Sequence, residues 1–219
     1  GNITLTGRGI NQSLGTINAN GSISGAVAGD GAAGGAVVLT GHDGTESGSI
    51  TLNGTLRTLN NTTAAITIRG TSNLVLPSII ATNGTLIIGD DTATVGQISG
   101  NISQASSTTI LAKTLTLGTA TNGIGGSVVL TNSGNKFDNL GIVKVGDVAN
   151  TQYDLDINDT TGGLTIAGAQ TSTGGIRIAT AKSTGAVGTL VIGANNITAS
   201  GDISLAGETI SQLSGSSIN

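Results

Sequence analysis

The residues with the clearest capacity for chemistry are the acids of the stretch YDLDINDTTG. Asp154, Asp156 and Asn158 have the D-x-D-x-N spacing of a calcium loop, in which carboxylate and amide oxygens take up a hard cation. Such a loop has Gly at its sixth position and Glu at its twelfth, but this sequence has Asp159 and Thr165 there. The spacing therefore predicts only a weak calcium site, and no other cofactor is expected.

The same stretch also fits a plain strand. Leu155 and Ile157 alternate with the acids, and this alternation is typical of a strand with one buried and one solvent-facing side. The strand is the preferred interpretation. The calcium site is kept as its alternative.

Acid–base chemistry has little support in the sequence. His42 and Asp43 adjoin in TGHDGT, and catalysis would need a nucleophile and an orienting partner that adjacency does not supply. The pair is predicted to form a surface turn, and Asp90 and Asp91 a charged turn. With one His and no Cys, thiol chemistry and multi-His zinc sites are excluded within this chain.

The basic residues are isolated in the sequence. Polysaccharide lyases and hydrolases that have a β-helix fold need clustered carboxylates, or a basic residue beside calcium-binding acids, within a groove. Such an enzyme would require acids and bases from successive strands to converge in space. The chain is therefore predicted not to be an enzyme. The isolated bases considered are Arg69, Arg177, Lys113, Lys144 and Lys182.

Two repeated polar patterns suggest surface functions. Asn-x-Ser/Thr sequons recur and indicate candidate glycosylation sites, although Asn turns followed by Thr-containing strands would also generate them. The candidates are Asn2, Asn53, Asn83, Asn101, Asn158 and Asn196. Outward threonines suggest an ice-binding face, but their T-x-T spacing is not uniformly repeated, which disfavours that interpretation. These threonines include Thr63, Thr67, Thr114, Thr116 and Thr165.

The composition shows what kind of scaffold must position these residues. Glycine supplies 37 of 219 residues, aromatic residues make up 1%, and there is no Trp, Met or Cys. The core must therefore consist of Val, Ile, Leu and Ala in narrow, regular layers. Charged residues make up 9% with a net charge of −4, which argues against nucleic acid as a partner. No apolar run reaches the ~20 residues that span a bilayer, and a secretion signal is expected outside these residues.

Short segments of alternating apolar and polar residues recur along the chain and predict strands. They start about 9 to 13 residues apart, so two of them give a period near 20, and such a period is the signature of a solenoid. Sustained helical periodicity is absent from the sequence. The segments are Ile3–Leu5, Ala36–Leu39, Ile50–Leu52, Ile66–Ile68, Leu74–Leu76, Leu86–Ile88, Leu115–Leu117, Val128–Leu130, Ile142–Val145, Leu155–Ile157, Leu164–Ile166, Ile176–Ile178, Leu190–Ile192 and Ile203–Leu205.

Among the folds with short strands at this spacing, a right-handed parallel β-helix fits best. An antiparallel sandwich or barrel normally has aromatic anchors, and a propeller has a Trp-containing signature. The prediction is an all-β solenoid of about 20 residues per coil, continuous over residues 1–219. The sequence does not decide between two and three faces per coil. The single proline, Pro77, is expected at a strand end.

Two stretches resemble the filamentous-haemagglutinin family of two-partner secretion exoproteins. They are GNITLTGRGINQSLGTINANGSISGA at residues 1–26 and GGSVVLTNSGNKFDNLGIVKVG at 125–146. The second resembles the family's recurring V-x-L-T-N-x-G-N-x-F segment. The matching residues are Val128, Leu130, Thr131, Asn132, Gly134, Asn135 and Phe137. Autotransporter passengers share this architecture and remain an alternative.

The resemblance implies an excerpt from the β-helical shaft of a longer protein, secreted or at the bacterial cell surface. It implies an outer-membrane transporter as partner, and a host-cell or surface receptor bound elsewhere on the parent protein. The family's amino-terminal secretion motifs contain Asn-Pro and have no counterpart, because Pro77 is the single proline. Two alternatives remain: a self-assembling filament or matrix subunit whose copies stack through coil ends, and a carbohydrate-active β-helix. Membrane insertion is not expected.

Overall fold

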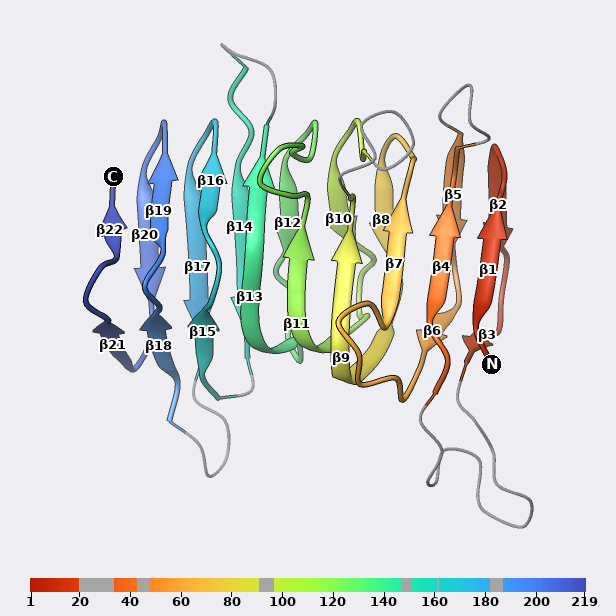
Figure 1. Ribbon diagram of the computed structural model, residues 1–219, viewed down its shortest axis with the longest axis horizontal. Coiled ribbons are helices and arrows are strands. Elements are labelled where there is room, and N and C mark those ends of the chain that lie inside the picture. Colours follow the sequence, from red (N-terminus) through yellow and green to blue (C-terminus); the bar gives the residue numbers. More distant parts are fainter. Residues whose placement is uncertain (20–33, 43–47, 91–96, 147–150, 161, 182–186) are drawn as a thin grey trace.

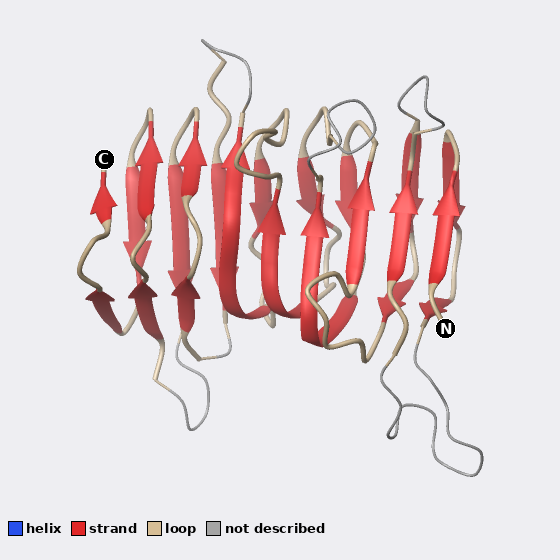
Figure 2. Cartoon of the chain, viewed as in Figure 1, coloured by secondary structure: helices blue, strands red, loops and turns tan. Residues whose placement is uncertain are grey.

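The computed structural model describes residues 1–19, 34–42, 48–90, 97–146, 151–160, 162–181 and 187–219. All helical or strand structure in this part of the chain is β-strand (Figure 2). A helix long and apolar enough to cross a membrane is not found among these residues. The prediction of an all-β chain is confirmed for them.

Every ladder between named strands is parallel, which excludes a fold built from antiparallel hairpins for the described residues. The strands form a 14-stranded sheet, a 6-stranded sheet and a 2-stranded sheet. In Figure 1 the largest sheet lies in front and the other two lie behind it, while the chain progresses along the long axis from the amino to the carboxyl end.

In the view of Figure 1 the strands stand in three columns, named here upper front, back and lower front. The chain passes through them in that order. The upper front column contains β1 (Ile3–Thr6), β4 (Val37–Thr40), β7 (Ile66–Arg69), β16 (Gln170–Ser172), β19 (Asn196–Ala199) and β22 (Ser217–Ile218). The back column contains β2 (Gly9–Gln12), β5 (Ser49–Leu52), β8 (Leu74–Leu76), β10 (Ile102–Gln104), β12 (Val128–Leu130), β14 (Leu155–Asp159), β17 (Ile176–Thr180) and β20 (Ile203–Ala206). The lower front column contains β3 (Thr16–Asn18), β6 (Thr55–Arg57), β15 (Leu164–Ile166), β18 (Thr189–Ile192) and β21 (Thr209–Gln212).

Three long strands join the two front columns into one sheet. They are β9 (Ile79–Ile88), β11 (Ile110–Leu117) and β13 (Lys136–Val145). The first part of β9 pairs with β6 and its last part pairs with β7. Within this stretch the chain therefore passes from the lower to the upper front column without leaving the strand.

The register of the back sheet corrects the predicted period of the solenoid. The pairing runs Leu74, Ile102, Val128, Leu155, Ile176, and successive rounds advance the chain by 28, 26, 27 and 21 residues. Consecutive strands are spaced about as predicted. One round, from a strand to the next strand of the same column, contains three strands instead of the predicted two. The period is therefore about one strand longer than predicted for most of this region.

The core is built by stacking like residues on like residues. In the front sheet Val37, Ile66, Leu86, Leu115 and Leu140 follow one another in register, and each is fully buried. Burying an aliphatic side chain of this kind contributes about 1.5–3 kcal/mol. Because every layer rests on the next, this stabilisation extends along the whole column.

Polar side chains form a second ladder where the chain enters the back column. The Asn73 Oδ1 accepts from the Asn101 backbone N–H at 2.8 Å, and the Asn101 Oδ1 accepts from the Ser127 N–H at 2.8 Å. The Ser127 Oγ accepts from the Asp154 N–H at 3.0 Å, and the Asp154 Oδ1 accepts from the Gly175 N–H at 2.7 Å. Each side chain thus fixes the turn of the next round, which holds the strands in register.

Candidate functional site

The strongest concentration of charge at the back sheet lies over β14, β17 and β20. Asp156, Arg177 and Ser204 occupy one register position on these three strands. A groove of about 420 Å³ runs over them, and its lining also includes Asp154 and Asp202. This groove brings acids and a base from successive strands together.

Arg177 organises this groove. Its Nε lies 2.8 Å from the Asp156 Oδ1, and its Nη2 donates to the Asn158 Oδ1 at 3.1 Å. The Asn158 Nδ2 donates to the Thr131 carbonyl at 3.2 Å, and the Asp154 Oδ1 is bonded to the Gly175 N–H. The side chains of Arg177 and Asp156 are 45% and 31% exposed, so water screens the pair and its contribution to stability is small.

The geometry bears directly on the candidate calcium ligands Asp154, Asp156 and Asn158. The strand interpretation is confirmed, because Leu155–Asp159 forms β14 with Leu155 and Ile157 buried. A guanidinium cation bridges two of the three candidate ligands where a calcium ion would have to lie. In the described part of the chain, no group of three or more His, Cys, Asp or Glu side chains is arranged to hold a metal.

We expect calcium to leave the thermal stability unchanged, because it would have to displace Arg177 from Asp156 and Asn158. Raising calcium chloride from zero (with chelator) to about 5 mM should shift the melting temperature by less than about 1 °C. A site with the millimolar to 0.1 mM affinity of extracellular modules would raise it by about 2 to 9 °C. Such a rise, lost in the Asp156→Asn variant, would contradict the expectation and support the calcium prediction.

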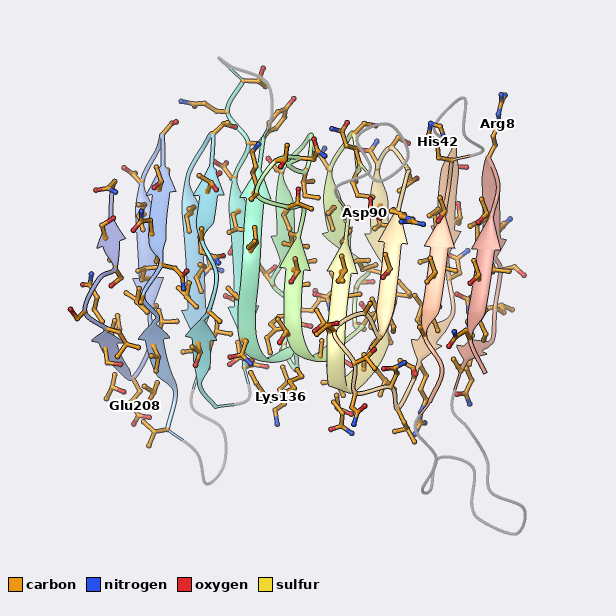
Figure 3. The ribbon with its side chains drawn as sticks, in the orientation of Figure 1. Arg8, His42, Asp90, Lys136 and Glu208 are labelled. Atoms are coloured by element: carbon orange, nitrogen blue, oxygen red, sulfur yellow. The ribbon has the colours of Figure 1, made fainter. Side chains whose placement is uncertain are left out.

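The other ionisable candidates are spread along the molecule. Figure 3 labels Arg8, His42 and Asp90 toward the amino-terminal end of the long axis, Lys136 near its middle and Glu208 toward the other end. His42 is 4% exposed, so the prediction that it lies in a surface turn is wrong for this residue. Beside it, the Gly48 N–H donates to the Gly41 carbonyl at 2.5 Å. Asp43 lies outside the described residues.

Arg69 is isolated in sequence but paired in space. Its Nη1 forms an ion pair with Asp90, and its Nε donates to the Thr40 Oγ1 at 3.0 Å. Lys144 donates from its Nζ to the Thr121 carbonyl at 2.6 Å. Lys113 lines a separate groove of about 410 Å³ on the front side. Asp91 and Lys182 lie outside the described residues.

The candidate glycosylation sites differ in accessibility. Five of them are exposed: Asn83 lies within β9, and Asn2, Asn53, Asn101 and Asn196 lie at turns or strand ends. Asn158 is half-buried and bonded through both its amide oxygen and its amide nitrogen, to Arg177 and to Thr131. Attachment of a sugar would replace one of the two N–H groups of this nitrogen at a half-buried position. The exposed five therefore have the better geometry, while glycosylation itself stays a prediction.

The candidate threonines do not make one uniform face. Thr67 and Thr116 stand in one row of the front sheet, but the row alternates with Val38 and Ile87. Thr67 is 8% exposed, so the expectation that it is an outward threonine is wrong. Thr114 and Thr165 stand in another row, separated by Asn139. Thr63 lies in a turn before β7. This mixed array lacks the repeated T-x-T motif that an ice-binding face needs.

A buried polar cluster at the corner between the back and lower front columns could not be found from the sequence. Asn135 is fully buried, and its Oδ1 accepts from the Ile110 N–H at 3.0 Å and from the Gln104 Nε2 at 2.8 Å. Asp159 is 1% exposed and accepts from the Phe137 N–H at 3.0 Å and from the Thr180 Oγ1 at 2.7 Å. These side chains replace ladder bonds at the corner and have a structural role.

Comparison with known proteins adds no relative. No protein-family model matches the chain, and neither a curated protein nor a solved structure matches it.

Proposed function

We propose that the chain is a segment of a right-handed parallel β-helix that serves as the rigid shaft of a secreted bacterial surface adhesin or exoprotein. In this role it is a spacer that holds a binding region away from the cell. It has no catalytic step, and its function depends on length and stiffness.

The observation that carries this proposal is the parallel pairing along the front sheet. Its ladders run from β1 to β21 without interruption, and the chain visits the three columns in the same order throughout. Ladder hydrogen bonds in such a sheet run between strands and therefore along the long axis. Stretching or bending the molecule would have to break several of these bonds at the same time and also separate the stacked aliphatic layers. Such an arrangement favours stiffness and slow proteolysis.

The proposed partners follow from the resemblance to the filamentous-haemagglutinin family and from the surface. An outer-membrane transporter would export the chain, and a receptor on a host cell or another surface would bind elsewhere on the parent protein. The outward side chains are mostly Thr, Ser, Asn and small aliphatics. Such a surface fits a solvated spacer better than a nucleic-acid-binding or membrane-inserted protein. Sugars on exposed sequons would extend the hydrated surface.

The test is the size and location of the native protein in the organism that produces it. An antibody against the chain should detect a cell-surface or secreted product far larger than the 21.2 kDa of these residues, still large after chemical deglycosylation. Protease added to intact cells should remove the cell-associated signal. A product no larger than the chain itself would contradict the shaft proposal and favour the self-assembling filament subunit. A large product confined to the cytoplasm would contradict both.

A further inference from the structure

The back column has one break in its ladder among the described strands. β2 pairs with β5, and β8 through β20 form a continuous sheet, but no ladder joins β5 to β8. The two strands still approach within 8 Å of each other, Cα to Cα. Directly paired strands stand about 4.7–4.9 Å apart, and two strands that flank a third stand about twice as far apart. The gap between β5 and β8 is therefore too wide for direct pairing and too narrow for an added strand.

A hydroxyl group already bridges the two strands at one end of this gap. The Thr71 Oγ1 accepts from the Ile50 N–H at 3.1 Å and donates to the Gly48 carbonyl at 3.2 Å. It thus stands where a direct ladder bond would otherwise lie, since an isolated bridge joins Gly48 to Thr71 at the same place. A gap of this kind accommodates one hydroxyl oxygen between facing peptide groups.

Further along the gap the facing peptide groups belong to Leu52 and Val75. The N–H of Leu74 donates to Asn101, so the N–H and carbonyl of Val75, the next residue, face β5. On β5 the N–H of Asn53 donates to the Gln12 carbonyl of β2, so the peptide groups of Leu52 face β8. Both edges present a donor and an acceptor, and the ladders of the described strands use neither.

A groove of about 620 Å³ opens over these peptide groups and follows β5 from Ser49 to Thr55. Its volume lies within the range of small-ligand sites. On the β5 side it is lined by the hydroxyl and amide groups of Ser49, Thr51 and Asn53. On the β8 side Val75, which is 50% exposed, gives it an aliphatic surface. None of the described residues that line the groove is ionisable.

We propose that this groove between β5 and β8 binds a neutral oligosaccharide. A sugar hydroxyl both donates and accepts, so it can bridge the peptide groups of Leu52 and Val75 as the Thr71 hydroxyl bridges Ile50 and Gly48. Further hydroxyls of the sugar bond to Thr51 and Asn53, while the C–H face of a ring packs on Val75. The binding point is lateral on the back sheet, and it does not depend on the role of the chain as a shaft.

The charge of the ligand follows from the lining of the groove. An anionic sugar would lose water in a groove that offers no counter-charge, so it is disfavoured. The groove also has no aromatic platform on which a sugar ring could stack. We therefore expect weak binding, with a dissociation constant of about 1 mM.

The experiment titrates the isotopically labelled 219-residue chain with three neutral tetrasaccharides: cellotetraose, maltotetraose and chitotetraose. At least one of them should give saturable NMR shift changes centred on the amides of Leu52 and Val75. A β-1,4-linked tetraglucuronate, which carries a carboxylate in place of each C6 hydroxymethyl group of cellotetraose, is the charged control. It should leave these amides unchanged over the same range of concentration.

Matched protein variants test the geometry of the groove. Val75→Glu places a charge at its centre, and Val129→Glu places the same charge in the same outward row but on β12, outside the groove. Val75→Glu should weaken binding at least about fivefold, because the carboxylate would lose water beneath the sugar, whereas Val129→Glu should leave the affinity unchanged. Thr51→Val removes one hydroxyl and keeps the shape, so it should weaken binding about 2- to 10-fold.

Three results would overturn the proposal. The first is that none of the three neutral sugars gives saturable shift changes. The second is that the changes centre on residues outside the groove, or that Val75→Glu and Val129→Glu bind the sugar equally well. The third is that the tetraglucuronate binds the groove as tightly as the neutral sugars, which would mean that the uncharged lining does not select the ligand.

Discussion

Replacing Phe137 by alanine should lower the free energy of unfolding by about 3–5 kcal/mol. Phe137 is the largest of the fully buried side chains and the single phenylalanine of the sequence. It stacks in register on Ala112, which in turn stacks on Ala81, and both alanines are buried. The two small residues leave room that the ring fills. Its removal would leave a cavity that a rigid, hydrogen-bonded sheet cannot close by relaxation.

The measurement is urea denaturation followed by circular dichroism. Ile142→Ala on the same strand is the matched control, because Ile142 is 38% exposed and should cost less than about 1 kcal/mol. The double variant Phe137→Ala with Ala112→Leu should recover part of the loss, since the added side chain lies in the neighbouring layer of the same column. A loss from Phe137→Ala no larger than that of the control would contradict the stacking argument.

The sequence predicted the strands that carry two Val, Ile or Leu residues in alternation, and it missed those that carry one or none. All fourteen predicted segments overlap strands of the structure. The missed strands include GINQ, TLR and QTS. GINQ and TLR have a single large aliphatic residue among polar residues or glycine, and QTS has no aliphatic residue. Gln170 of QTS points into the core between Val143 and Ile197, where its Nε2 donates to the carbonyls of Gly141 and Gly168. Alternation of apolar and polar residues cannot reveal such a strand, and the period was underestimated for this reason.

The geometry of the candidate site was also only partly predictable from the sequence. Asp154, Asp156 and Asn158 were visible as a spacing along one strand, but their partner Arg177 lies on the next strand of the sheet. That pairing depends on the register between rounds, and the round that joins β14 to β17 is shorter than its neighbours. Without the register, a cation bridging the acids could not be anticipated. The burial of His42 was likewise not visible from the sequence around it.

The motif that carries the family resemblance has a physical basis at the corner after β12. Gly134 has a φ of 91°, in the left-handed region that favours glycine, so the chain can turn inward there. This turn directs Asn135 into the interior, and two residues later Phe137 enters the core. Asn132 donates from its Nδ2 to the Ala105 carbonyl at 2.6 Å, which ties the turn to the preceding round. The sequence pattern therefore specifies the turn at this corner. Its structural role could be understood only once the pairing between successive rounds was known.

Replacing Asn135 by alanine should destabilise the protein by about 2–5 kcal/mol, nearly as much as loss of the phenylalanine ring. The change leaves the N–H of Ile110 without its acceptor and the Oε1 of Gln104 without the donor that Asn135 supplies. A buried polar group left unsatisfied costs about 1–3 kcal/mol, and at least two such groups are created here. Asn139→Ala is the matched control, because Asn139 is half-buried and donates from its Nδ2 to the Lys113 carbonyl at a long 3.5 Å. It should change the stability by less than about 0.5 kcal/mol.

Two further variants separate lost hydrogen bonds from lost volume. Asn135→Leu fills the space but offers no acceptor, so it should be about as unstable as Asn135→Ala in the same urea denaturation. Adding Gln104→Leu to Asn135→Leu should recover part of the loss, since removing both partners of a buried pair costs less than removing one. Full recovery of stability in Asn135→Leu alone would show that the asparagine only fills volume. The corner would then be held by its glycine and its ladders, not by the buried amide that links the rounds.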